Sequence, residues 1–268
     1  MKAAVLGSPI AHSLSPVLHT AAYQALGLDD WTYQAISCDE DALPAFVGSR
    51  GPDWAGLSLT MPLKRTVLPL LDHVDPLAAA TGGANTVVFR PDGRYGYNTD
   101  VQGIVDALTE VGAPAPRMVA RDPSRAAGLL AAAERLHLRV RLRSFADLTA
   151  GESVPDLLIS TVPSDAIAHY PERMRVTAQA PAALLDAIYD PWPTPLAEAA
   201  AAAGAVVASG FAMLLHQAAA QVELMTGKPA PLEAMRAAGE AELARRAAGL
   251  PRGDAPPDPP GKRRRSKR

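Results

Sequence analysis

The 268-residue sequence predicts an α/β fold with a mainly parallel sheet, large enough for two modest domains. Two observations predict this fold class. Apolar runs, beginning with KAAVLG at 2–7, alternate with helical patterns along the chain, an order typical of parallel sheets. Hydrophobic residues make up 48% of the chain, which is ordinary for a globular protein with a sizeable core.

The first hundred residues carry signals for strands, helices and a hairpin. Strands are expected at 2–7, 31–37 and 55–60, and helices at about 15–27, 40–50 and 62–73. Ser15-Pro16 is a favoured pair for an N-cap and a first helical residue, and Gly27 favours the end of the same helix. The turn Pro91-Asp92-Gly93 separates two strand-like segments, 83–89 and 93–98, and predicts a β-hairpin.

The second half of the chain continues the alternation. Strands are expected at 118–122, 140–144, 154–163, 182–189 and 205–209, and helices at 101–111, 124–136, 194–203, 211–225 and 232–248. The last two helices are amphipathic enough to pack back across the body. Residues 251–268 are Pro-rich and then basic, a composition that cannot bury a core and predicts a disordered tail.

Charge and cysteine content exclude several classes of protein and of binding site. The net charge of −2 combines an acidic body with the basic tail, whose end is either a solvated appendage or a weak, unspecific contact for polyanions. The single cysteine, Cys38, excludes a disulfide framework and a Cys-based metal site, and the histidines show no metal-site spacing. No apolar run matches a signal peptide or a membrane span. We expect a soluble, cytoplasmic protein with no metal, membrane or specific nucleic-acid partner.

Polar residues follow the first and third predicted strands, where open parallel sheets bind ligands. Ser13 and Ser15 lie in the loop that enters the first helix, where hydroxyl and N–H groups can hold a carboxylate, although Ser15 can equally be only a cap. Thr60 and Lys64 follow the third strand. A charged lysine beside the positive end of a helix is disfavoured, which suits proton transfer. The commoner alternative is an exposed surface lysine.

A second polar group surrounds the predicted hairpin. Asp100 is placed near a helix N-terminus, where its ionised form is stabilised, and is either a reactive carboxylate or an N-cap. Asn85 and Asn98 can hold substrate hydroxyls or only their own turns. Hydroxyls for a carboxylate, amides for hydroxyls and a Lys/Asp pair to move a proton together fit a small polyhydroxylated carboxylic acid.

Seven sequence pieces, in family order along most of the chain, resemble the shikimate dehydrogenase family. They are GSPIAHSLSPVLH, GLSLTMPLK, TGGANTVVF, GYNTDVQG, STVP, DAIYDPWPTPL and SGFAMLLHQAAAQVELMTG. The resemblance implies an enzyme that uses NADP to interconvert shikimate and 3-dehydroshikimate in aromatic amino-acid biosynthesis. It also implies a catalytic α/β domain at 1–103, completed by helices at 211–250, a Rossmann-like NADP domain at 104–210, and a monomer or homodimer.

Residue roles follow from the matched pieces. Ser13 and Ser15 would face the substrate carboxylate, and Lys64 would be the acid/base that works with Asp100. The ring and its hydroxyls would be bound by the other polar matches, which are Thr60, Asn85, Tyr189 and Gln217. In the NADP domain, Arg121 would meet the 2′-phosphate and Gly210 would lie near the nicotinamide.

Two features depart from the family pattern. Ser58 stands where the family usually has asparagine, a change expected to move one hydrogen bond. The glycine-rich phosphate loop of the NADP domain, with its strand and helix, is missing at Arg117–Met118, and no GxG spacing occurs elsewhere in the chain. The resemblance therefore implies a truncated Rossmann-like domain, in which Arg121 meets the cofactor or is only a surface arginine.

Two functions remain open on these grounds. One is an NADP-dependent shikimate dehydrogenase, and the alternative is a catalytically impaired shikimate-binding remnant that lacks the phosphate loop. An error in the gene sequence would also explain the gap, and resequencing would then reveal an in-frame insertion at Arg117–Met118.

Overall fold

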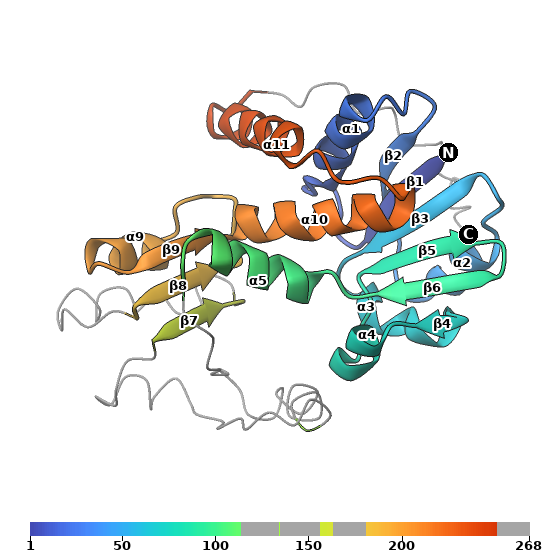
Figure 1. The fold of residues 1–268 in the computed structure, drawn as a ribbon, viewed down its shortest axis with the longest axis horizontal. Helices are drawn as coiled ribbons and strands as arrows, with labels where there is room; N and C mark the ends of the chain where they lie inside the picture. Colours follow the sequence, from blue (N-terminus) through green and yellow to red (C-terminus); the bar gives the residue numbers. More distant parts are fainter. Residues whose placement is uncertain (114–133, 135–155, 163–180, 251–268) are drawn as a thin grey trace, which may run out of the picture.

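The computed structural model describes residues 1–113, 134, 156–162 and 181–250, which form two sheets. The six-stranded sheet has the order β2-β1-β3-β5-β6-β4, and the three-stranded sheet has the order β7-β8-β9. The strands are β1 (Lys2–Gly7), β2 (Thr32–Ser37), β3 (Trp54–Leu59), β4 (His73–Val74), β5 (Thr86–Arg90), β6 (Gly93–Tyr97), β7 (Leu157–Ser160), β8 (Ala183–Asp186) and β9 (Val206–Ser209). The two sheets lie at opposite ends of the described structure (Figure 1).

Helices cover both sheets and connect them. They are α1 (Ser15–Ala25), α2 (Leu43–Gly48), α3 (Leu63–Thr66), α4 (Pro76–Thr81), α5 (Asp100–Glu110), α9 (Pro195–Ala202), α10 (Gly210–Thr226) and α11 (Leu232–Ala247), with a 3-10 turn, η1 (Leu68–Leu70). Side-chain caps start three of them. Asp75 Oδ1 accepts from the Leu77 N–H of α4 at 2.9 Å, Thr194 Oγ1 from the Ala197 N–H of α9 at 3.1 Å, and Ser209 Oγ from the Ala212 N–H of α10 at 3.2 Å.

The six-stranded sheet is mixed rather than mainly parallel. β1 pairs in parallel with β2 and β3, and β4 pairs in parallel with β6, but β5 is antiparallel to both β3 and β6. The reversal comes from the β5–β6 hairpin, which the Pro91-Asp92-Gly93 turn predicts and which the register Arg90↔Gly93 confirms. The three-stranded sheet is parallel throughout, as the alternating strands and helices predict.

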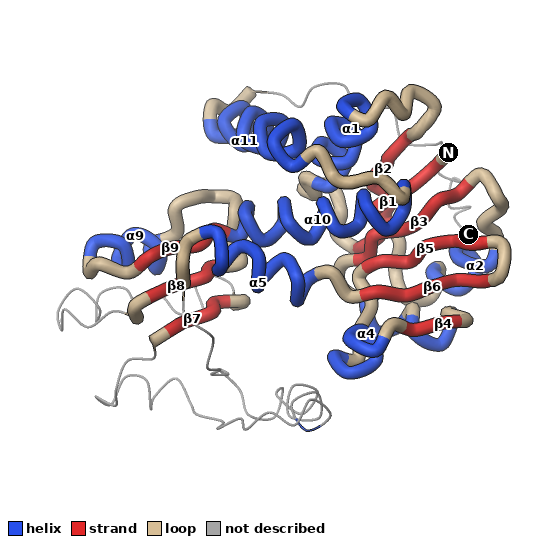
Figure 2. Tube along the Cα trace, in the orientation of Figure 1, coloured by secondary structure: helices blue, strands red, loops and turns tan. Residues whose placement is uncertain are grey.

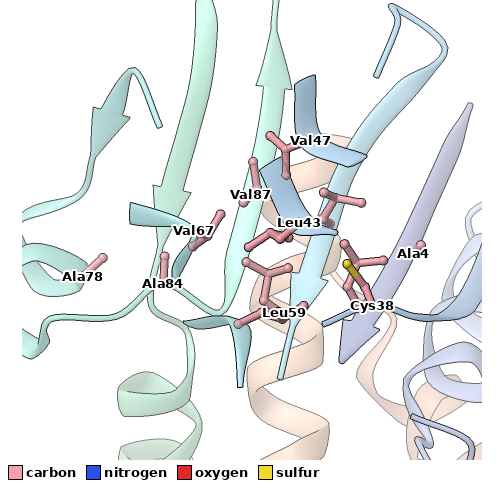
Figure 3. Packing of buried hydrophobic residues seen from close by; sticks show 12 residues of the cluster. Ala4, Cys38, Leu43, Val47, Leu59, Val67, Ala78, Ala84 and Val87 are labelled. Carbon is pink, nitrogen blue, oxygen red and sulfur yellow. The ribbon is translucent and has the colours of Figure 1, made fainter. Parts of the chain in front are cut away.

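Both faces of the six-stranded sheet are buried, as expected where helices cover the strands. Ala4 and Leu6 of β1 point into one cluster, with side chains of α2 and α3 (Figure 3). Their neighbours Ala3 and Val5 point into the other cluster, which includes side chains of α1 and α10. This alternation leaves the ends of the strands as the places where polar side chains reach the surface.

The helix expected over 62–73 is wrong in its length. The chain forms only the single turn α3, then η1 and the two-residue strand β4. Pro69 explains the early end, because proline has no N–H to donate to the preceding turn and its ring crowds that turn. Lys64 lies in the short α3, in the segment that follows β3.

α5 and α10 lie side by side between the two sheets (Figure 2). Their close approach depends on Gly103, where a Cβ would lie 2.7 Å from Met213 O and 2.9 Å from Gln217 Cβ, both on α10. At their far ends, the two helices pack on the three-stranded sheet through an apolar cluster that contains Ala107 and Ala212. The α5–α10 pair therefore connects the two sheets.

Parts of the predicted organisation fall outside the described residues. These parts are the strands expected at 118–122 and 140–144, most of the helix at 124–136, and the tail at 251–268. The predicted boundary between the two domains, at 103/104, lies within α5. Across the described ranges, no helix is long and apolar enough to cross a membrane, and no group of His, Cys, Asp and Glu in them is arranged to hold a metal ion.

Candidate functional site

Lys64 and Asp100 form an ion pair beyond the strand ends of the six-stranded sheet. Lys64 lies in α3, and its Nζ is 2.6 Å from Oδ2 of Asp100, the first residue of α5. The backbone holds Lys64 as well, because its carbonyl oxygen accepts a 2.8 Å hydrogen bond from the Ala84 N–H. The two side chains are 36% and 22% exposed, so both can reach a bound molecule.

The structure does not provide the positive helix end that the sequence predicts beside Lys64. A helix of one turn has little macrodipole, so the positive helix end expected beside Lys64 contributes little. Its main partner is instead the Asp100 carboxylate, which also distinguishes Lys64 from a solvated surface lysine. The Asp100 carboxylate binds Lys64 Nζ, so Asp100 does more than cap a helix. The N-cap position of α5 is occupied by Thr99.

Asn85 is the centre of the hydrogen bonds behind this pair. It directly precedes β5 and is 1% exposed. Its Nδ2 donates to Asp100 Oδ1 and Thr99 Oγ1, each at 2.9 Å, and to Gln217 Oε1 at 3.3 Å. Its Oδ1 accepts from the Thr99 N–H and the Thr86 hydroxyl, each at 2.8 Å. Since a backbone N–H can only donate, Oδ1 must face Thr99, and the amide nitrogen must face Asp100.

The other two amides of the predicted region have different roles. Asn98 holds its own turn, because its Nδ2 donates to Thr81 Oγ1 and Gly83 O and its Oδ1 accepts from the Asp100 N–H. Gln217 lies on α10 and is 7% exposed, with its Nε2 donating to Leu214 O at 2.9 Å. Residue patterns alone do not single out Gln217, and only the family resemblance identifies it.

The predicted carboxylate and ring contacts come from three other segments. Ser15 is the first residue of α1 rather than its cap, and its N–H donates to Ser13 Oγ at 3.2 Å. Thr60 follows β3, and its Cγ2 packs so closely against Gly7 of β1 that a side chain at Gly7 would collide with it. Tyr189 follows β8 and packs against the apolar cluster of α1 and α10. Burial raises the pKa of Tyr189, which keeps its phenol neutral and able to donate.

His19 is a buried residue beside the site that sequence patterns do not identify. Its ring stacks on Tyr33 with centroids 3.9 Å apart, and its Nε2 lies 3.3 Å from Gln221 Oε1. Within the described residues, its Nδ1 has no hydrogen-bond partner. Desolvation lowers the pKa of His19 to about 3, although the hydrogen bond with Gln221 acts in the opposite direction. The ring is therefore neutral near pH 7.

We expect the free energy of unfolding to fall as the pH drops below about 6.5, in part because of His19. The unfolded chain protonates this side chain at its ordinary pKa of 6.5, whereas the folded protein does so only at about 3. Stability is therefore lost with acidification across that window, at about 1.4 kcal/mol per pH unit from this group. Denaturant unfolding of the wild type and His19→Gln at several pH values measures the slope, and equal slopes would contradict this origin.

The carboxyl ends of β7, β8 and β9 lie side by side at Ser160, Asp186 and Ser209. Open parallel sheets bind dinucleotides at this edge. Ser160 Oγ is buried, and it has no hydrogen-bond partner within the described ranges, so it is available to a bound molecule. This edge therefore provides a polar group where a dinucleotide such as NADP would lie.

Gly210 lies at the turn from β9 into α10, on the same edge. A Cβ here would lie 2.8 Å from the carbonyl carbon of Ile188 and closer still to Ala187, so the backbones of two segments meet at this position. Such close backbone approach is a common use of glycine at cofactor turns. Both described features fit NADP, while Arg121 lies outside the described residues.

Two family models match this chain. The shikimate dehydrogenase substrate binding domain matches residues 5–87, and the shikimate 5'-dehydrogenase C-terminal domain matches residues 210–238. A shikimate dehydrogenase (NADP(+)) of Halobacterium salinarum is 36% identical over 262 positions, which cover 89% of this chain and 98% of the relative.

Solved structures agree with these matches. The crystal structure of Mycobacterium tuberculosis shikimate dehydrogenase is 44% identical, with a TM-score of 0.79 over 90% of this chain and 99% of that one. The Thermus thermophilus enzyme, solved in complex with NADP(H) and shikimate, is 29% identical, with a TM-score of 0.70 over 91% and 100%. Because the likeness covers nearly the full length of these relatives and includes the Lys64–Asp100 region, the chain belongs to the shikimate dehydrogenase family.

Proposed function

We propose that this chain is an NADP-dependent shikimate dehydrogenase of aromatic amino-acid biosynthesis. The observation that carries the proposal is the Lys64–Asp100 pair, with Nζ and Oδ2 2.6 Å apart and Asn85 Nδ2 on the second carboxylate oxygen. Two relatives support the proposal. The Halobacterium salinarum protein, which is similar over nearly its full length, is a shikimate dehydrogenase (NADP(+)). The Thermus thermophilus structure, 29% identical to this chain, holds NADP(H) and shikimate.

The proposed substrate contacts use the polar groups at the strand ends. Ser13 and Ser15 bind the substrate carboxylate, with hydroxyl groups near the N-terminus of α1. The ring and its hydroxyls are bound by four residues from β3, β5, β8 and α10 or their flanks: Thr60, Asn85, Tyr189 and Gln217.

In the proposed reaction, the reacting carbon of shikimate loses a hydride and its hydroxyl loses a proton. NADP, when bound, supplies the hydride acceptor. Lys64 takes the hydroxyl proton as a general base and returns it in the reverse direction. Asp100 holds Nζ through Oδ2, while Asn85 holds Oδ1 so that the carboxylate does not turn away.

The proposed domain division follows the two sheets. Residues 1–103, with the helices at 211–250, bind substrate, and residues 104–210 form the NADP domain, with Gly210 beside the nicotinamide and Arg121 at the 2′-phosphate. We propose a cytoplasmic monomer or homodimer.

We also propose that the NADP domain is truncated by loss of the glycine-rich phosphate loop at Arg117–Met118. The support is the absence of a GxG spacing in the chain and the length of the alignments. The Halobacterium salinarum alignment spans 262 positions but includes only 89% of this 268-residue chain. The chain has too few aligned residues to fill all the positions, so that relative carries residues with no counterpart here. A strand, a loop and a helix amount to roughly 20–30 residues.

Two measurements on the purified chain test the proposed function. Oxidation of NADPH by 3-dehydroshikimate is the expected activity, and calorimetric titrations with shikimate and with NADPH separate substrate binding from cofactor binding. Activity together with both binding signals supports the dehydrogenase. Shikimate binding without NADPH binding or turnover supports the alternative, a shikimate-binding remnant, and would refute the enzyme. Turnover with tight NADPH binding excludes the remnant and shows that the shortened domain still holds its cofactor.

A further inference from the structure

A buried line of hydrogen bonds begins at Tyr33 and ends at Asp100. The Tyr33 hydroxyl donates to Ser58 Oγ at 2.6 Å, and the Ser58 hydroxyl donates to Gln221 Oε1 at 2.7 Å. The three side chains come from β2, β3 and α10, and they are 7%, 3% and 1% exposed. No residue pattern predicts this contact, because Ser58 and Gln221 are 163 positions apart.

The line continues from Gln221 to the proposed catalytic pair. Gln221 Nε2 donates to Thr86 Oγ1 at 3.1 Å, and the Thr86 hydroxyl donates to Asn85 Oδ1 at 2.8 Å. Asn85 Nδ2 then donates to Asp100 Oδ1 at 2.9 Å. Every donor along the line points the same way, toward the Asp100 carboxylate.

Backbone groups fix this direction at two points. Gln221 Nε2 also donates to the Asn85 carbonyl oxygen at 3.3 Å, and the Thr99 N–H donates to Asn85 Oδ1 at 2.8 Å. A flipped Gln221 would place its oxygen against that carbonyl, and a flipped Asn85 would place its NH₂ against that N–H. Neither flip is compatible with a buried amide, because an unsatisfied buried polar group costs more than an ordinary hydrogen bond contributes.

The line also reaches the other end of the proposed substrate site. Burial raises the pKa of the Tyr33 hydroxyl, although its hydrogen bonds with Ser58 and Ser15 act in the opposite direction. Tyr33 therefore stays protonated and touches a serine proposed to hold the substrate carboxylate. On α10, Gln221 lies one turn beyond Gln217, on the same face of the helix. The helix packs against β3 and β5, whose strands lie side by side in Figure 1.

We propose that Tyr33, Ser58 and Gln221 are positioning residues that fix where Asn85, Asp100 and Gln217 meet the substrate. The inference rests on the proposed function, and it deepens that function by adding three buried residues to the site. It also gives a role to Ser58, which stands where the family usually has asparagine: its hydroxyl connects Tyr33 to Gln221 across the sheet and helix. None of the three touches substrate in this assignment.

Tyr23 offers a matched control for Tyr33. Both are buried tyrosines of the same aromatic cluster, with ring centroids 6.4 Å apart, but the Tyr23 hydroxyl has no hydrogen-bond partner within the described part of the chain. Tyr23→Phe and Tyr33→Phe each remove one hydroxyl and leave the ring. Only the second interrupts the line to Asp100, so a difference between them isolates the hydrogen bond from the packing.

The experiment compares the wild type with Tyr33→Phe, Ser58→Ala, their double variant and Tyr23→Phe. We expect the shikimate Kd and KM to rise about five- to tenfold in Tyr33→Phe and in Ser58→Ala, because each change removes at least one buried hydrogen bond of the line. The KM for NADP should stay unchanged. The shikimate Kd of the double variant should not exceed that of the single variant with the higher Kd, because both changes break the same line of hydrogen bonds. Tyr23→Phe should match the wild type.

Three results would overturn the proposal. One is an unchanged shikimate Kd in Tyr33→Phe and Ser58→Ala, and another is an equal loss in Tyr23→Phe. The third is a fall in kcat with both KM values unchanged and a lower melting temperature, which is what a purely structural role produces. The shikimate Kd of the wild type is measured first, by calorimetry without NADP. Absence of binding there would overturn the proposed function itself, whereas wild-type binding with unaffected variants would overturn only the positioning role.

Discussion

Replacing Lys64 with methionine is expected to lower kcat/KM for shikimate oxidation by about 1,000-fold, within the range that loss of a general acid/base produces. Methionine keeps an unbranched side chain, one atom shorter than that of lysine, but cannot take the hydroxyl proton. Asp100 would keep its Asn85 hydrogen bond, so the carboxylate stays in place. Steady-state kinetics measures the loss, and calorimetry should show that shikimate still binds.

Lys2 provides the control for this substitution. Its Nζ also pairs with a carboxylate, that of Asp53, at 2.8 Å, but both side chains are more than half exposed, at 55% and 53%. Lys2→Met should therefore change kcat/KM by less than about twofold, since exposed ion pairs contribute little. An activity of Lys64→Met within about tenfold of the wild type would show that the proton leaves by another route.

Replacing Gly210 with alanine is expected to destabilise the protein by about 2–3 kcal/mol and to weaken NADPH binding. The added Cβ would meet backbone atoms of Ala187 and Ile188, and backbone cannot move aside as a flexible side chain can. The loop after β8 and the start of α10 would have to separate, which disturbs the edge proposed to hold the nicotinamide. Denaturant unfolding and NADPH calorimetry measure the two effects.

Gly48→Ala is the matched control. Gly48 also lies at a helix terminus, but a Cβ there would have no atom within 4 Å. This substitution should leave NADPH binding unchanged and be neutral or slightly stabilising, because alanine restricts the unfolded chain more than glycine does. Equal stabilities of Gly210→Ala and the wild type would show that the two backbones separate at little cost.

Local chemistry explains why much of the fold could be predicted. Apolar runs predict β1 and β3 because both faces of their sheet are buried, and the Pro91-Asp92-Gly93 turn predicts the hairpin. The error over 62–73 has a local cause too, because the effect of Pro69 outweighs the helical pattern. β4 could not be predicted, since it has two exposed residues and its pairing with β6 depends on a distant segment.

The candidate site also contains residues that could be predicted from local sequence and residues that could not. Lys64, Asn85 and Asp100 could be proposed because they lie near the ends of predicted strands, and the position of strand ends is a local property of the sequence. Their pairing confirms that these three segments meet. Gln217 required the family pattern, and Gln221 was missed altogether. A polar residue on an apolar helix acquires meaning only from its partners, and those partners lie in other parts of the chain.

The close contact at Gly103 holds α5 at a defined position along α10. Hydride transfer requires reacting atoms about 3–3.5 Å apart, and a misplacement of 1 Å can cost about 100-fold in rate. Along α5, Asp100 stands at one end and Ala107 touches the three-stranded sheet, so seven residues at a rise of 1.5 Å separate them by about 10 Å. Because α5 packs closely on α10 at Gly103, the distance from Asp100, which holds Lys64, to the edge proposed to bind NADP would be set by the length of α5.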